Sequence, residues 1–438
     1  MLEKAERIFF YLFVFFLPFQ TRALLKSFSQ PFNEWTSVSF YLTDLLVLAV
    51  IFLWIIRIIK KEGFLKIGKT EIVLFLFWLV GALSIFKAEN SWLAIFRELK
   101  LVEFVFLFLY LKNNFSIYSL IPWKESGQAR IEKLALVIIS SGLLQSLIAI
   151  GQFFRQKSFG LSFLDESPLA SDLSGVAKIS VEGSQMIRGY GLTPHPNVLA
   201  AFLVSAIFVC LYLMIGRFGK NKLTDLGFSG ALYVLMLGLA VTFSRTAILF
   251  GLLAVFVWLF YLFFKEKYRA LILRTALVFS VILLFLTVVF WPLISNRFDS
   301  NLVLEGQAYD LRVFYNKTAL EFIKHNSLLG VGIGNFVPFF MEKEKLTEAW
   351  MYQPAHNLYL LIGSEMGILG LAVFLIFLVL VMVGFYKNAF KKPIFFGIFL
   401  LTVSYLLFAA SDHYFWTIQQ GGLMFWGLLG IMAGKSGE

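Results

Sequence analysis

The sequence predicts an all-α polytopic membrane protein, a single integral membrane domain over residues 1–438 with about twelve transmembrane helices. Composition is the first reason: 59% of the 438 residues are hydrophobic, 15% are charged, and the mean hydropathy is +0.80. The second is that apolar residues come in runs of about twenty, long enough to cross a bilayer as helices. The third is the placement of Lys and Arg, which favours one side of the membrane.

The apolar runs give the positions of the spans. They are expected at Ile8–Phe28, Phe40–Ile59, Ile72–Phe86, Leu93–Leu111, Ile131–Phe154, Asn197–Ile215, Leu226–Phe243, Thr246–Phe264, Leu271–Leu293, Asn357–Phe385, Ile394–Ala410 and Tyr414–Met432. The first run has the charged flank and apolar stretch of a signal peptide. No small-residue cleavage site follows it, because Leu17-Pro18-Phe19-Gln20 is bulky, so we interpret it as a retained span.

The charges set the predicted topology. If the N-terminus is cytoplasmic, 22 of the 38 Lys and Arg residues lie on the inside segments, and every short inside loop is basic. This satisfies the positive-inside rule and predicts an inner (plasma) membrane protein with both termini in the cytoplasm. The net charge of +11 is therefore topological and does not indicate a nucleic-acid partner.

Two outside loops are long, 155–196 and 294–355, and loops of this length are usually functional. Both are polar and contain glycine. Within the second, Leu311, Tyr315, Thr318 and Phe322 follow helical spacing and predict a helix along the membrane surface.

The end of the second loop carries a histidine, His356, in the stretch QPAHNLYLLIGSEMGILGL. On a helix, the face below it would carry Leu360, Gly363, Gly367 and Gly370, and Gly363 with Gly367 forms a GxxxG pair that permits close packing. This pattern has two interpretations. It is either a packing seam capped by a histidine, or an imidazole held rigidly at the membrane surface.

Other cationic and imidazole side chains share the predicted outer side. The histidines are His195, His325, His356 and His413, and the arginines near span ends are Arg188, Arg245 and Arg312. Arg245 lies in TFSRTA, which joins two spans with almost no loop, so it either snorkels to headgroups or binds an anionic group. Arg188 lies in IRGYGLTPHPN, a stiff lead-in in which Asn197 could cap the next helix and His195 belongs to the junction.

The sequence predicts no metal, nucleotide or other cofactor. Cys210 is the single cysteine, and neither Asp412 with His413 nor His356 with Glu365 has ligand spacing. The run GVGIGNF lacks a βαβ context, so we interpret it as a turn that returns the chain to the membrane. No Ser/His/Asp nucleophile motif is present.

What remains is a set of guanidinium groups and one imidazole at the same membrane boundary. Arginines suit a phosphate or diphosphate, because their fork donates paired hydrogen bonds. An imidazole at a helix N-terminus is biased towards its neutral form, which suits a general base. A lipid-linked diphosphate donor at the membrane surface would need both.

In their order, the motifs IRGYGLTPHPN, TFSRTA, RVFYNKTA with LLGVGIGNF, and AHNLYLLIGSEMGILG resemble the O-antigen ligase and O-antigen polymerase superfamily. The resemblance covers roughly residues 188–371. It implies a metal-independent membrane glycosyltransferase with a GT-C-like helical fold. Such enzymes move a glycan from a polyprenyl diphosphate carrier to an acceptor hydroxyl on the outer face, and the acceptor is a lipid core, a glycan or a protein.

The resemblance also implies roles for individual residues. His356 would be the acceptor-activating base, Arg188 and Arg245 would grip the diphosphate, and Arg312 matches the arginine of the long loop. Supporting residues are His195, Asn197, Asn357 and Glu365. Polymerase activity is the alternative within the superfamily.

A lipid-linked glycan flippase or transporter is the alternative of another class. It would place charges within spans and break helices near the bilayer centre. The charges of RELKLVE are the candidates, and they either pair with one another or line a cavity: Arg97, Glu98, Lys100 and Glu103.

Overall fold

The computed structural model describes residues 2–60, 67–115, 126–181, 184–217, 221–266, 269–298 and 303–434, which are mostly helical. The helices are α1 Leu2–Phe16, α2 Leu42–Lys60, α3 Lys69–Ser84, α4 Ser91–Asn114, α5 Ser126–Arg155, α6 Pro196–Arg217, α7 Lys222–Val241, α8 Leu252–Phe263, α9 Arg269–Phe298, α10 Val303–His325, α11 Phe336–Lys343, α12 Leu358–Ala389, α13 Pro393–Ala409, α14 Tyr414–Thr417 and α15 Gln419–Ala433. The strands are β1 Arg22–Ser27, β2 Ser37–Tyr41, β3 Lys178–Val181 and β4 Ser184–Ile187.

The helical membrane class is confirmed. Seven helices in the described ranges are long and apolar enough to cross a bilayer, namely 42–60, 69–87, 132–155, 196–216, 222–241, 269–296 and 358–389. Two shorter apolar helices cover 247–263 and 393–409. Each of the predicted spans overlaps a helix, but the number twelve stays a prediction.

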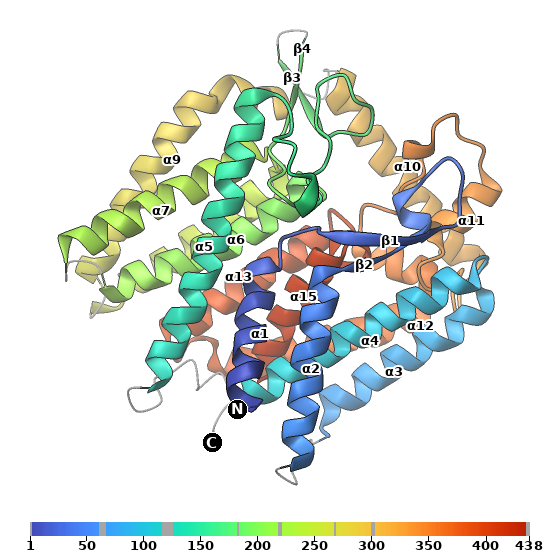
Figure 1. Ribbon diagram of the computed structural model, residues 1–438, viewed down its shortest axis with the longest axis horizontal. Helices are drawn as coiled ribbons and strands as arrows, with labels where there is room; N and C mark the ends of the chain where they lie inside the picture. Colours follow the sequence, from blue (N-terminus) through green and yellow to red (C-terminus); the bar gives the residue numbers. More distant parts are fainter. Residues whose placement is uncertain are drawn as a thin grey trace.

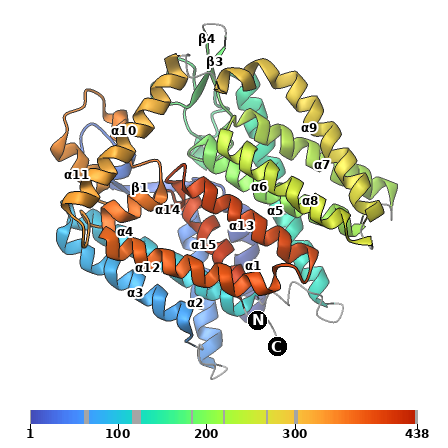
Figure 2. The ribbon, with the colours of Figure 1, turned by 180° about the vertical axis from the view of Figure 1, so that it is seen from behind.

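The long helices form two groups (Figures 1 and 2). In one group α5 and α6 pack along α7, and α9 lies beside α7. In the other α12 packs along α3, and α15 packs along α4. α1 contacts both groups through α2 and α5. The β3–β4 hairpin lies at the end of the molecule away from the start of α1 (Figure 1).

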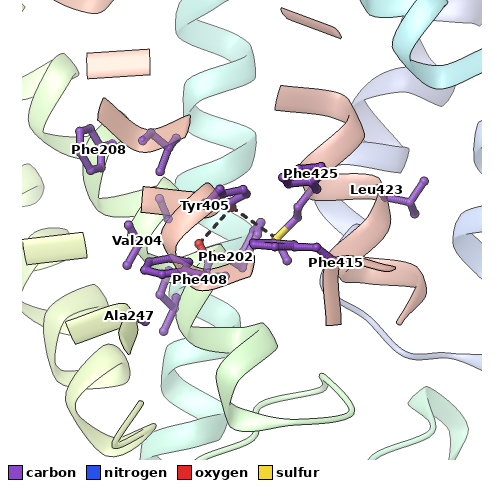
Figure 3. Packing of buried hydrophobic residues seen from close by; sticks show 14 of the residues in the cluster. Phe202, Val204, Phe208, Ala247, Tyr405, Phe408, Phe415, Leu423 and Phe425 are labelled. Carbon is purple, nitrogen blue, oxygen red and sulfur yellow. Dashed lines mark hydrogen bonds between the residues drawn. The ribbon is translucent and has the colours of Figure 1, made fainter. Parts of the chain in front are cut away.

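Aromatic packing joins α6, α13 and α14 (Figure 3). Tyr405 of α13 stacks on Phe415 of α14 with ring centroids 4.7 Å apart, and its hydroxyl lies 2.7 Å from that of Ser205 in α6. Because buried aromatic pairs add to area burial, this cluster fixes the ends of α6, α13 and α14 relative to one another. Those ends carry the polar residues described below.

Three span boundaries differ from the prediction. α1 ends at Phe16, and residues 22–27 form a strand that pairs antiparallel with β2, Arg22 opposite Tyr41. Pro18 explains the end of α1, because proline cannot continue a helix. Phe40 lies in β2, so the second helix begins at Leu42. The last long helix begins at Gln419, after an extended Ile418.

The long loops are structured. The first carries the β3–β4 hairpin, and the second carries α10, which confirms the predicted helix and buries Tyr315 and Phe322 on one face. α11 was not predicted. Its residues Phe336 and Phe340 pack with Tyr315 and Phe322 in a separate apolar cluster. The loop is therefore a folded part of the molecule.

α12 is interrupted at Gly367, which has a φ of +70°. The preceding turn inserts its backbone there, because the amides of Val331 and Gly332 donate to the carbonyls of Ser364 and Glu365, both at 2.9 Å. The close approach predicted from GxxxG is confirmed at Gly367, where a Cβ would lie 2.2 Å from the Leu328 carbonyl oxygen. The neighbour is a loop and not the helix that the motif suggests.

Candidate functional site

Three connections meet at one end of the helices: the lead-in to α6, the lead-in to α12 and the turn between α13 and α14. They bring together His356, Asp412 and His413, whose potential ligand atoms all lie within 4.8 Å of one another. The rings of His356 and His413 are 5.0 Å apart at 84°. We call these three residues, with His195, the imidazole cluster.

A chain of hydrogen bonds holds the carboxylate of the cluster. Asn197 Nδ2 donates to Asp412 Oδ2 at 2.7 Å, and Arg188 Nη2 donates to Asn197 Oδ1 at 2.7 Å. Arg188 Nε donates in turn to the carbonyl of Thr242 at 2.6 Å. Since all three side chains are buried, these bonds fix Asp412 firmly.

The predicted helix cap at Asn197 is wrong. α6 begins at Pro196, so Asn197 lies inside the helix and its side chain is used by Arg188 and Asp412. The Nδ1 of His195 accepts the amide N–H of Asn197 at 3.1 Å, which is the bond that a capping side chain would make. His195 therefore belongs to the junction, as the sequence indicated.

His356 precedes α12, and Asn357 caps that helix by accepting the amides of Tyr359 and Leu360. The ring of Tyr315, from α10, stacks on the His356 ring at 5.7 Å and 16°. Nδ1 of His356 is buried and has no hydrogen-bond partner among the described residues.

His413 is fully enclosed. Its Nδ1 lies 2.7 Å from the Thr417 hydroxyl, and its Nε2 lies 3.9 Å from Asp412 Oδ1. Trp35, from the β1–β2 hairpin, meets the ring edge-on at 5.0 Å. The hairpin therefore forms one wall of the cluster.

The electrostatics separate the cluster into a carboxylate and neutral imidazoles. Burial lowers the pKa of His356 well below its ordinary value, and the charge of Arg312 acts in the same direction. Burial likewise lowers the pKa of His413, and it lowers that of His195 to about 3, assisted by Arg188. The helix dipole predicts a neutral imidazole at His356, and burial acts in the same direction on its pKa.

Asp412 behaves in the opposite way. Burial alone would raise the pKa of this carboxyl, but the surrounding histidines and Arg312 lower it below its ordinary range. At neutral pH the cluster therefore holds one carboxylate beside neutral imidazoles.

Two of the predicted arginines act on this cluster, Arg188 through Asn197 and Arg312 through its charge. Arg188 is buried and bonded to the turn at Thr242, and the amide of Gly189 also donates to Val241 there, at 2.8 Å. The same turn carries Arg245, half-buried where a π-helix, Ala247–Gly251, begins. Arg312 lies three residues before Tyr315 on α10, and its charge acts on His356, His413 and Asp412.

Two predicted outer residues serve elsewhere. His325 is exposed at the end of α10. Glu365 is buried in α12, where it accepts the indole N–H of Trp416 at 2.8 Å and the amide of Phe336 at 3.4 Å. Glu365 thus braces α14 and the turn before α11.

Asp412 and His413 are the site residues that sequence reasoning passed over. Their spacing along the chain does not predict a metal site, because they have no ligand spacing with another donor. The structure corrects that argument, since His356, Asp412 and His413 converge from separate connections. The placement of Lys and Arg could have indicated this meeting. It predicts the same side of the membrane for His356 and for the turn with Asp412 and His413.

This triad has the donor types that a zinc-like ion accepts. Its surroundings disfavour a divalent cation, because Arg188 is bonded through Asn197 to the carboxylate, and Arg312 adds a second positive charge. An anionic ligand suits the arginines better. The predicted absence of a metal remains a prediction.

The fold and the site define a polytopic helical membrane protein with a polar cluster at one end of its spans. Residues 230–375, about a third of the chain, match the family model described as O-antigen ligase. This confirms the resemblance to the O-antigen ligase and O-antigen polymerase superfamily. The match includes Arg245, Arg312 and His356, whereas Arg188, Asp412 and His413 lie outside it. No curated protein matches the chain.

Proposed function

We propose that this protein is a glycosyltransferase that moves a glycan from a polyprenyl diphosphate carrier to an acceptor hydroxyl on the outer face of the membrane. One observation carries the proposal. A neutral imidazole, His356, lies beside a carboxylate that is held through Asn197 by a buried arginine. The family match over residues 230–375 supports the reaction class.

In the proposed step, Nε2 of His356 takes the proton of the acceptor hydroxyl. The acceptor oxygen forms a bond with the anomeric carbon, the bond from that carbon to the phosphate oxygen breaks, and its electron pair leaves with the diphosphate. The carboxylate of Asp412 stabilises the imidazolium that forms. Because the pKa of His356 is lowered, its ring is unprotonated at neutral pH and Nε2 has a free lone pair for the proton.

Arg245 and Arg312 supply positive charge for the leaving diphosphate in this proposal. Forked guanidinium groups fixed before the reaction stabilise charge as it develops. Arg188 has a positioning role in this proposal. Its guanidinium donates hydrogen bonds to Asn197, which holds Asp412, and to the Thr242 carbonyl, in the connection that leads to Arg245.

The test is transfer of a labelled glycan from its polyprenyl diphosphate carrier in membranes that contain the protein. His356→Ala should lower the transfer rate about a hundredfold or more, as loss of a general base does. His325→Ala is the matched control, because that histidine is exposed and lies outside the cluster. Transfer by His356→Ala at the wild-type rate would remove the base assignment.

The acceptor separates ligase from polymerase activity. We favour a ligase, because the matched family model carries that description. Mass spectrometry of surface glycans from cells that lack the protein shows which linkage disappears. Loss of the bond to a lipid core supports a ligase, and loss of bonds between glycan repeats supports a polymerase.

A flippase is the second candidate, and the interruption of α12 at Gly367 favours it, since transporters often use broken helices. In this structure the break is filled by backbone from the preceding turn. Movement of intact donor across liposomes, without release of the carrier diphosphate, would support the flippase.

A further inference from the structure

A polar pocket lies next to His413. It is enclosed by the β1–β2 hairpin, the first turns of α4, the turn before α11 and α14, and its volume is about 50 Å³. Trp35 and Thr417 line it, and these two residues also contact His413. The pocket and the imidazole cluster therefore share a wall.

Arg97 is the least satisfied charge in this pocket. Among the described residues it donates one hydrogen bond, from Nη1 to the Thr417 carbonyl at 3.1 Å, and it forms no ion pair within 4.0 Å. The other lining cations are already paired. Arg22 lies 2.7 Å from Glu34, and Lys100 pairs with Asp44.

Gly334 admits Arg97 to the pocket. It has a φ of +68°, and a Cβ there would lie 2.2 Å from Cγ of Arg97. Any side chain at this position would displace the arginine. The turn at Gly334 therefore leaves room for the Arg97 side chain, whose guanidinium group donates only one hydrogen bond among the described residues.

The lining combines donors, acceptors and aromatic rings. Tyr41 and Ser39 bring hydroxyls, Glu34 and Glu365 bring carboxylates, and Trp35 and Trp416 bring indoles. Sugar hydroxyls both donate and accept hydrogen bonds, and the C–H faces of sugar rings pack on aromatic surfaces. A volume of about 50 Å³ holds a few waters, so it suits the edge of one sugar ring.

We propose that this pocket binds a saccharide at the end of the acceptor, with Arg97 as the main hydrogen-bond donor. This rests on the proposed transferase function and narrows it, because the acceptor is then a glycan or lipid-linked saccharide and not a protein. In this arrangement Arg245 and Arg312 bind the donor diphosphate. The acceptor enters past the β1–β2 hairpin, and its hydroxyl meets the donor at His356.

The kinetic test uses purified full-length protein and a saccharide acceptor. Arg97→Gln should raise the KM for the acceptor about tenfold or more, as expected for a lost charged hydrogen bond, with kcat and the donor KM little changed. A fall in kcat with an unchanged acceptor KM would overturn the proposal. It would mean that Arg97 acts only through Thr417 on His413.

A second variant tests the same pocket without removing the arginine. Gly334→Ala should also raise the acceptor KM, because the new Cβ displaces Arg97. Gly160→Ala is the matched control, since Gly160 also has a positive φ, +84°, and nothing lies within 4 Å of a Cβ there. An acceptor KM for Gly334→Ala no higher than that for Gly160→Ala would contradict the proposal.

A binding measurement separates this proposal from the transferase itself. Methyl glucoside, methyl N-acetylglucosaminide and glucuronate should raise the melting temperature of the wild type but not of Arg97→Gln, with glycerol as the control additive. Equal stabilisation of both proteins, or stabilisation by a serine-containing peptide alone, overturns the saccharide site. Saccharide binding that depends on Arg97, in a protein that transfers no glycan, would refute only the transferase.

Discussion

The molecule contains two buried groups of ionisable side chains that differ in their bonding. In the first, the imidazole cluster, Nδ1 of His356 has no hydrogen-bond partner among the described residues. In the second, which we call the ion-pair network, Lys100 pairs with Asp44 and with Glu103, 3.4 Å away. Gln419 donates to both of those carboxylates.

The difference indicates what each group does. The ion-pair network joins α2, α4 and α15 and leaves its cation fully paired, which is the arrangement of a structural brace. The imidazole cluster is held through Asn197 and Arg188, and it contains a buried ring nitrogen, Nδ1 of His356, that no described residue satisfies. The substitutions below test this contrast.

Lys100→Met should give the largest loss of stability. It leaves Asp44 and Glu103 without their cation, and breaking a buried pair in this way costs about 3–5 kcal/mol. We expect a markedly lower melting temperature in detergent, with the kcat of the remaining folded protein close to wild type. A large fall in kcat at unchanged stability would place Lys100 in the reaction.

Arg245→Lys should give the reverse pattern. A point charge does not replace a guanidinium fork, so kcat/KM for the lipid-linked donor should fall about a hundredfold. Thermal stability should change less than in Lys100→Met, because Arg245 lies half-exposed in the connection after α7 and Lys keeps its charge. Equal donor affinity and rate in this variant would count against diphosphate binding by Arg245.

Asp412→Asn removes the charge of the imidazole cluster while keeping an oxygen that can accept from Asn197. We expect a fall in the transfer rate of about tenfold, smaller than that from removing the base. The acid limb of the pH profile should also move to lower pH, because the carboxylate raises the pKa of His356. An unmoved profile would show that Asp412 does not act on the imidazole.

The pH dependence of the wild type follows from the lowered pKa values. His356 stays neutral below the ordinary histidine range, so transfer should persist at pH values well under about 6.5. The free energy of unfolding should fall as the pH drops through that range. The histidines His195, His356 and His413 have lower pKa values in the folded protein than in the unfolded chain, so the unfolded chain binds more protons. Rate and melting temperature measured between neutral and acidic pH check both statements.

Chelation should have the smallest effect. If His356 acts as a base, EDTA treatment followed by gel filtration leaves the transfer rate unchanged. Loss of activity that zinc or another divalent ion restores would instead assign the triad of His356, Asp412 and His413 to a metal.

The sequence predicted the helical framework, because runs of apolar residues report directly on helices long enough to cross a membrane. It placed His356 at a helix start and Arg245 in a tight turn, and both are found there. It missed β1 and β2, since two short strands next to apolar helices resemble continued spans. It also missed the meeting of His356 with Asp412, because contacts between distant loops leave no periodic pattern.

The interruption of α12 has a consequence for how this protein can be rebuilt. Residues 327–332 are synthesised before α12, and their backbone supplies bonds that the helix lacks around Gly367. The backbone bonds of α12 around Gly367 therefore depend on residues 327–332, which precede the helix in the chain. A chimera that exchanges the loop 294–355 with that of a relative must carry the loop and the first half of α12 together. Exchange of the loop alone would remove these backbone hydrogen bonds and displace the start of α12, which follows His356.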